Sequence, residues 1–162
     1  MRSILHDDSA VNIEIGYILN FLVLLIFAGA IVGPFYLASD SSSKQAMRAG
    51  YTDLGSEIAR DITNMYLSSA HLEDDVNINI ERSIPLTIGG RGYSVLLKNA
   101  EPGGMASVEI EEGGLFGSRV STVLTSIDAG VTIDSIRPVY SGSGELIIGM
   151  VKNSTGVRIW IK

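Results

Sequence analysis

Glu14 stands directly before the long apolar run of this sequence, residues 15–37. An ionised carboxylate at the edge of a hydrocarbon layer is costly unless it reaches polar headgroups or finds a positive partner. Glu14 therefore either lies among headgroups or pairs with a positive group of a neighbouring copy, such as the amine of a shortened N-terminus.

Two glycines and one amide inside the run favour contact between helices. Gly29 and Gly33 have the small-residue spacing that lets membrane helices approach closely. Asn20 is the one strongly polar side chain of the run, and its amide can hydrogen-bond to a neighbouring helix or within its own. We predict self-association through Glu14, Asn20, Gly29 and Gly33. The alternative is a simple anchor in which the glycine spacing arises by chance.

The rest of the sequence offers little to catalysis. It contains no cysteine and no G-x-S-x-G or H-E-x-x-H motif, the patterns that place a nucleophile or a zinc ion. The acidic residues 73–75 lack the spacing of a calcium loop, and we interpret them as a solvated hinge. We therefore expect a protein that is not an enzyme, with no metal site and no cofactor.

A glycosylation sequon lies near the C-terminal end of the sequence. Asn153 is followed by Ser154 and Thr155, which completes the Asn-x-Ser/Thr pattern. The pattern falls between two predicted strands, where an outward-facing turn would present Asn153 as a possible acceptor of a glycan. A surface turn without a glycan is the alternative.

The overall charge excludes one class of partner. The formal net charge is −6, with 12 Lys and Arg against 18 Asp and Glu, and no run of five basic residues occurs. Nucleic-acid binding depends on a basic surface that neutralises phosphates. We expect no nucleic-acid partner.

The apolar run predicts a membrane-spanning or filament-core helix over residues 13–38, after a polar leader of residues 1–12. A helix rises about 1.5 Å per residue, so the run covers the roughly 30 Å hydrocarbon core of a bilayer. A cleaved secretory signal ending near Ala38 and Ser39 is an alternative, although its leader would be unusually acidic. The lipid bilayer is therefore the expected partner of this segment.

Residues 39–72 are predicted to form an amphipathic helical stalk. Apolar residues recur there at spacings of three and four, which is the helical period. We expect the stalk to be either a second helix or a continuation of the first after the polar residues 39–43. These apolar residues form a stripe along one side of the helix, which must be buried against another apolar surface. We predict that a sheet packs on Leu54, Ile58, Ile62 and Met65.

Residues 73–162 are predicted to form an antiparallel β domain. Polar and apolar residues alternate over 76–81, 93–98, 108–111 and 157–162, and shorter β-type runs cover 84–88, 120–124, 131–136 and 146–151. Glycine-rich turns separate these runs. The fold class is therefore α+β: a long N-terminal transmembrane or amphipathic helix followed by an antiparallel β-sandwich or barrel-like head.

The stretch DDSAVNIEIGYILNFLVLLIFAGAIVG resembles the N-terminus of archaeal type IV pilin-like proteins, the group that includes archaellins and archaellum accessory proteins. The resemblance implies a short leader, a hydrophobic helix that packs in a membrane or filament, and an extracellular β head. Many such pilins carry a glutamate at the fifth position of the mature chain. Processing between Ser9 and Ala10 would place Glu14 there.

The leader departs from the pattern of that family. Its peptidase usually follows a basic residue and a glycine, whereas this sequence has Asp7, Asp8 and Ser9 in that place. An uncleaved anchor is therefore an alternative to a filament subunit. Lys44 and Arg48 also favour, by a margin of one residue, a cytoplasmic C-terminal side, but we adopt the outward orientation that the resemblance implies.

Three functions remain open. The first is a pilin-like cell-surface structural protein, membrane-anchored or filament-forming, that associates with itself or with other pilin-like subunits. The second is a non-polymerising anchored binding module of the cell envelope, such as an archaellum stator-like accessory protein. The third is a secreted β domain released by signal cleavage.

Overall fold

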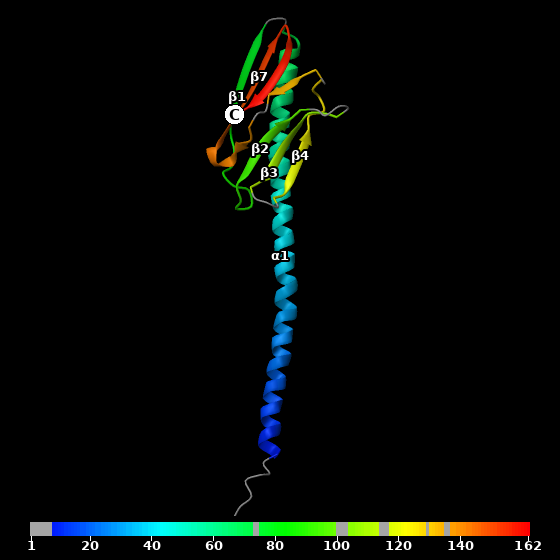
Figure 1. Cartoon of the computed structure of the whole chain (residues 1–162), viewed down its shortest axis with the longest axis vertical. Coiled ribbons are helices and arrows are strands. Elements are labelled where there is room, and N and C mark those ends of the chain that lie inside the picture. The colour runs from blue at the N-terminus through cyan, green and yellow to red at the C-terminus, as the bar shows by residue number, and fades with distance from the viewer. Residues whose placement is uncertain (1–7, 73–74, 100–103, 114–116, 129, 135–136) are drawn as a thin grey trace, which may run out of the picture. The chain divides into compact units, whose positions relative to one another are not determined.

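A computed structural model of the chain describes residues 8–72, 75–99, 104–113, 117–128, 130–134 and 137–162, with side chains from residue 15 onward (Figure 1). The chain divides into two compact units, Met1–Ser43 and Lys44–Lys162. We call the second the folded unit.

The N-terminal helical residues form a single helix, α1 (Asp8–Ala70). The polar residues 39–43 do not interrupt it, so the amphipathic stretch is a continuation of the apolar helix rather than a second helix. Pro34 lies inside α1, where its ring removes one backbone hydrogen-bond donor. The helix ends at Ala70, two residues before the end predicted for the stalk.

Two four-stranded sheets follow α1 among the described residues. One has the order β1-β7-β8-β5 and the other the order β4-β3-β2-β6. The strands are β1 (Val76–Ser83), β2 (Tyr93–Lys98), β3 (Ser107–Glu112), β4 (Arg119–Val123), β5 (Thr132–Asp134), β6 (Val139–Tyr140), β7 (Glu145–Asn153) and β8 (Gly156–Ile161). Their pairing is antiparallel except between β5 and β8, which run parallel. The α+β class with a β head is confirmed.

One predicted strand is absent. Residues 84–88 form no strand, and only a single bridge joins Ile88 to Arg91. Ile84 is nevertheless buried, and Pro85 next to it has no backbone N–H to donate to a ladder. The apolar character of this stretch therefore reflects burial of a loop against the core. Conversely, the two-residue strand β6 was not predicted.

The core of the folded unit forms between α1 and the sheets. Leu54, Ile58, Ile62 and Met65 of α1 are buried in one apolar cluster with residues of both sheets, which confirms their predicted packing. Gly55 marks a close approach of α1 to β4, because a Cβ there would lie 2.7 Å from Oγ1 of Thr122. The cluster also contains Met47 and Tyr51 of α1 and, from the sheets, Val95, Leu97, Val108, Ile110, Leu146, Ile148, Met150, Ile159 and Ile161.

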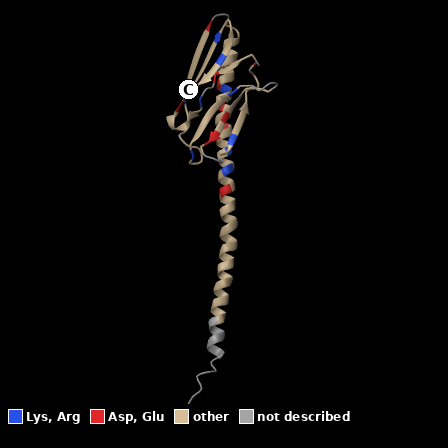
Figure 2. Cartoon of the chain, viewed as in Figure 1, with Lys and Arg blue, Asp and Glu red and all other residues tan. Residues whose placement is uncertain are grey.

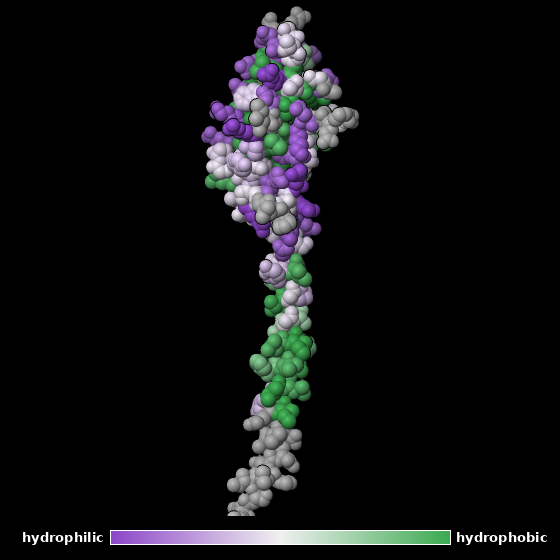
Figure 3. Space-filling model, viewed as in Figure 1, coloured by the Kyte–Doolittle hydropathy of each residue, from purple (hydrophilic) through white to green (hydrophobic). Residues whose placement is uncertain are grey.

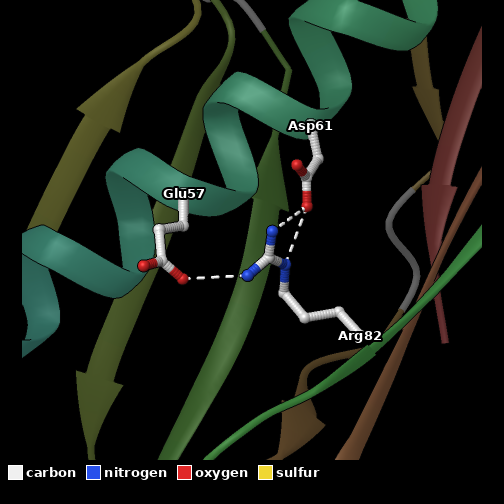
Figure 4. A network of polar contacts seen from close by, with 3 residues as sticks. All are labelled: Glu57, Asp61 and Arg82. Atoms are coloured by element: carbon white, nitrogen blue, oxygen red, sulfur yellow. Dashed lines mark hydrogen bonds and ion pairs between the residues drawn. The ribbon is translucent and has the colours of Figure 1, made fainter.

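Charged groups hold α1 to β1 and β7. Arg82, on the inward face of β1, donates from Nε to Oδ2 of Asp61 at 2.7 Å and from Nη1 to Oε2 of Glu57 at 2.8 Å (Figure 4). Lys152 of β7 donates from Nζ to the carbonyl oxygens of Ser69, at 2.8 Å, and of Leu72, at 2.7 Å. The last carbonyls of a helix lack partners within the helix and carry partial negative charge. Lys152 therefore acts as a cap supplied by the sheet.

Candidate functional site

The strongest functional candidate in the structure is the apolar segment of α1, residues 15–37. Large apolar side chains along it are exposed, from Val23 at 42% to Phe35 at 76%. The ribbon of this segment has none of the colours of Lys, Arg, Asp or Glu in Figure 2, and Figure 3 shows its hydrophobic surface. The helix is long and apolar enough to cross a membrane, and none of its most apolar stretch is buried within the chain. Such a surface requires an apolar environment from outside the chain.

Gly29 and Gly33 share one face of the apolar segment. They are about one helical turn apart, and a Cβ built at either would meet no atom within 4 Å. They form a shallow face on the helix, and no described residue packs against it. It would let another helix approach closely.

Asn20 lies on the other side of the helix. It precedes Gly29 by nine residues, about two and a half turns, so an interface centred on Gly29 and Gly33 does not include it. The Asn20 side chain is exposed. The two features therefore suit two different neighbours better than one pair of helices.

The remaining residues of the predicted association and processing sites lie near the start of α1. Ser9, Ala10 and Glu14 belong to the helix by their backbone. Their side chains lie outside the described residues. Pairing of Glu14 with a positive group stays a prediction.

The sequon lies in the turn between β7 and β8. Oδ1 of Asn153 accepts hydrogen bonds from the backbone N–H of Thr155, at 3.0 Å, and from the Thr155 hydroxyl. Gly156 completes the turn with a φ of 135°, in the left-handed region that favours glycine. Asn153 is exposed, and its Nδ2 donates no hydrogen bond to any residue that the structure describes. The nitrogen that a glycan would modify is therefore accessible.

Glu112 is a buried carboxylate at the end of β3, with its side chain 5% exposed. The Ser118 backbone N–H, 3.0 Å from Oε2, lowers the pKa of Glu112 below its ordinary value, and the Arg91 guanidinium lowers it further. Burial raises the pKa but does not cancel these effects. Burial raises the pKa of Tyr51, the negative charge of Glu112 raises it further, and Arg91 lowers it. The Tyr51 hydroxyl is buried without a hydrogen-bond partner among the described residues.

The lowered pKa of Glu112 predicts a dependence of stability on pH. A carboxyl whose folded pKa lies below its unfolded pKa stabilises the fold above the unfolded value, and the contribution is lost as pH falls through the folded pKa. We expect Glu112→Gln to reduce the free energy of unfolding at neutral pH and to flatten its decline toward about pH 3. Urea unfolding of both proteins at several pH values measures this. Parallel curves with a constant offset would contradict the prediction.

A hollow on the sheet surface was not predicted from the sequence. It has a volume of about 410 Å³ and lies on the outward face of β5, β7 and β8, around Trp160. The sequence pattern identified Trp160 only as part of a strand. A stronger signal was present, because this is the one tryptophan of the chain and it alternates with the apolar residues Ile159 and Ile161.

Comparisons of the chain with models of protein families, with curated proteins and with solved structures found no match.

Proposed function

We propose that this chain is a membrane-anchored, pilin-like surface protein that presents its folded unit outside the bilayer. The observation that carries the proposal is the exposed, uncharged apolar segment of α1, because no residue of its most apolar stretch is covered by the rest of the chain. Transfer of such a surface into hydrocarbon or into a bundle of like helices is strongly favourable. The role is structural rather than catalytic.

Self-association belongs to the same proposal. The open face at Gly29 and Gly33 suits a close helix neighbour, and Asn20 on the opposite side suits a second one. A helix with a contact on each side fits a bundle or filament better than an isolated dimer. The outward orientation of the folded unit rests on the resemblance of residues 7–33 to archaeal pilin-like proteins, and the accessible Asn153 is compatible with it.

Replacement of Gly29 and Gly33 by isoleucine tests the association. Bulky side chains would hold neighbouring helices apart, and we expect self-association in detergent micelles to weaken by about tenfold or more. Analytical ultracentrifugation measures the monomer fraction. Ala28→Ile is the matched control, because Ala28 is exposed on the same helix and lies neither on the face of Gly29 and Gly33 nor on that of Asn20.

The two outcomes separate the leading functions. Loss of association in the double variant, with the control unchanged, supports the self-associating protein. Equal association in all three proteins would contradict the glycine face.

The non-polymerising anchored binding module is a second candidate. One observation favours this function, the hollow around Trp160. A hollow on the sheet surface suits the binding of a ligand, which polymerisation of a filament subunit does not require. In that function the apolar segment serves only as a tether.

A further inference from the structure

Trp160 lies on the outward face of the β1-β7-β8-β5 sheet, opposite Gly149 of β7. A Cβ at Gly149 would come within 2.1 Å of Cε2 of the indole ring. The absence of a side chain at Gly149 therefore lets the ring lie against the β7 backbone. The ring is held in place while remaining partly exposed. Such contact between a cross-strand aromatic ring and a glycine stabilises a sheet.

Two hollows meet at this ring. The first, of about 410 Å³, is lined by Trp160 and Asp134 together with Thr132, Asn153, Thr155 and Arg158. The second, of about 600 Å³, is lined by the same Trp160 and Asp134 together with Arg137, Pro138, Val139 and Lys162. Because both are lined by Trp160 and Asp134, the two hollows adjoin, and we call them together the Trp160 groove.

The groove carries charged side chains that have no partner among the described residues. Arg137, Arg158 and Asp134 make no side-chain hydrogen bond or ion pair with any other residue in the part of the chain that the structure describes. Of the other arginines in the folded unit, Arg82, Arg91 and Arg119 are ion-paired, and Arg48 and Arg60 on α1 have no side-chain partner among the described residues. The two groove arginines are therefore available to a ligand. They outnumber the one aspartate in a chain whose net charge is −6.

We propose that the Trp160 groove binds an acidic oligosaccharide of the uronic-acid type. The face of an indole ring is negatively polarised and attracts the positively polarised C–H groups of a sugar ring. Arg137 and Arg158 would each bind a sugar carboxylate through the planar fork of the guanidinium. Asp134 and Thr132 would bind hydroxyl groups. This site is independent of the membrane anchor and of self-association.

The shape and lining of the groove favour a sugar over a peptide. Peptides that add to a sheet need a free strand edge and pockets for alternate side chains. β5, the edge strand beside the groove, is only three residues long. The first hollow is lined mainly by side chains with hydroxyl, amide, carboxyl or guanidinium groups. Such groups match the many hydroxyls of a sugar.

Tryptophan fluorescence gives a direct test, because Trp160 is the sole tryptophan of the chain. The full chain is placed in detergent micelles after production in a host without N-glycosylation, so that Asn153 is unmodified. It is then titrated with tetragalacturonic acid. We expect a saturable change in emission and a much weaker response to neutral maltotetraose.

Variants locate the binding. Arg158→Gln and Arg137→Gln are each expected to weaken tetragalacturonate binding by about tenfold, the effect of losing a charge-assisted hydrogen bond. Arg60→Gln is the matched control, since Arg60 is also exposed but lies on α1. Trp160→Ala, followed by titration calorimetry, is expected to abolish binding. An unchanged circular dichroism spectrum would show that the Trp160→Ala protein is folded. If that protein unfolds, the Arg137→Gln and Arg158→Gln proteins still test the site.

Three results would overturn the proposal. The first is the absence of a saturable response to tetragalacturonate. The second is equal binding of tetraglutamate, which would mean that the groove recognises negative charge on a peptide rather than a sugar. The third is equal binding by the Arg137 and Arg158 variants and the parent chain.

Discussion

Replacement of Leu25 and Ile26 by arginine is expected to release the chain from membranes. Both residues are near the middle of the apolar segment, and their side chains are 60% and 62% exposed. Each arginine at the centre of a membrane helix costs about 3 kcal/mol on scales derived from insertion, and the loss of each aliphatic side chain adds a few tenths. We expect the double variant to leave the membrane fraction after an alkaline wash that the parent chain resists.

Phenylalanine at the same two positions is the control. It preserves apolar character and changes only shape, so the Leu25→Phe, Ile26→Phe protein should remain in the membrane fraction. An arginine variant that sediments with washed membranes as fully as the parent would show that this segment is not the anchor.

The second large effect is expected at Ile58, in the part of α1 that belongs to the folded unit. Ile58 is 0% exposed and lies in the cluster that includes residues of both sheets. Ile58→Ala removes three buried carbons and leaves a cavity, which costs about 2–5 kcal/mol. That is a large share of the roughly 5–15 kcal/mol that stabilises a typical domain.

Urea unfolding followed by Trp160 emission measures the change at Ile58. Asn64→Ala is the matched control on the same helix, because Asn64 is exposed and should change the free energy of unfolding by less than about 0.5 kcal/mol. Equal midpoints for the two variants would contradict a core built on this face of α1.

The parts of the fold that follow a local period were predictable from the sequence. The helical stripe of residues 44–66 and the alternating strands depend on spacings of three, four and two, which burial imposes directly. The strand predicted over residues 84–88 was wrong, because an apolar residue buried in a loop, such as Ile84, produces the same sequence pattern as a residue of a buried strand. The parallel pairing of β5 with β8 joins residues about 26 apart in sequence, which no local pattern encodes.

The charge pairs were only partly accessible to the same reasoning. Arg82 occupies an inward position in the alternation of β1, so the sequence implies that it needs a buried partner. The partners Glu57 and Asp61 are one helical turn apart on α1, yet only the packing of the helix on the sheet brings them to Arg82. Likewise, only the packing of α1 on the sheet brings Lys152 of β7 to the carbonyl oxygens at the end of the helix.

The candidate functional residues also fall into those that a local sequence pattern predicts and those that only tertiary packing brings together. Gly29 and Gly33 could be identified from spacing alone, because both lie on one helix. The opposite placement of Asn20 also follows from the helical period, so the four residues predicted for self-association do not form a single face. The Trp160 groove combines residues of β5, β7 and β8 with the 137–139 segment, and it emerges only from their tertiary arrangement.

Labelling of single cysteines on intact cells tests the central claim most directly. The chain has no cysteine, so Asn64→Cys in the folded unit and Leu25→Cys in the apolar segment each give one defined thiol. A membrane-impermeant maleimide is added before and after lysis to cells that make each variant. The account predicts that position 64 reacts on intact cells and that position 25 reacts neither before nor after lysis. Reaction at position 64 only after lysis, or reaction at position 25 with the protein in the soluble fraction, would contradict a membrane-anchored surface protein.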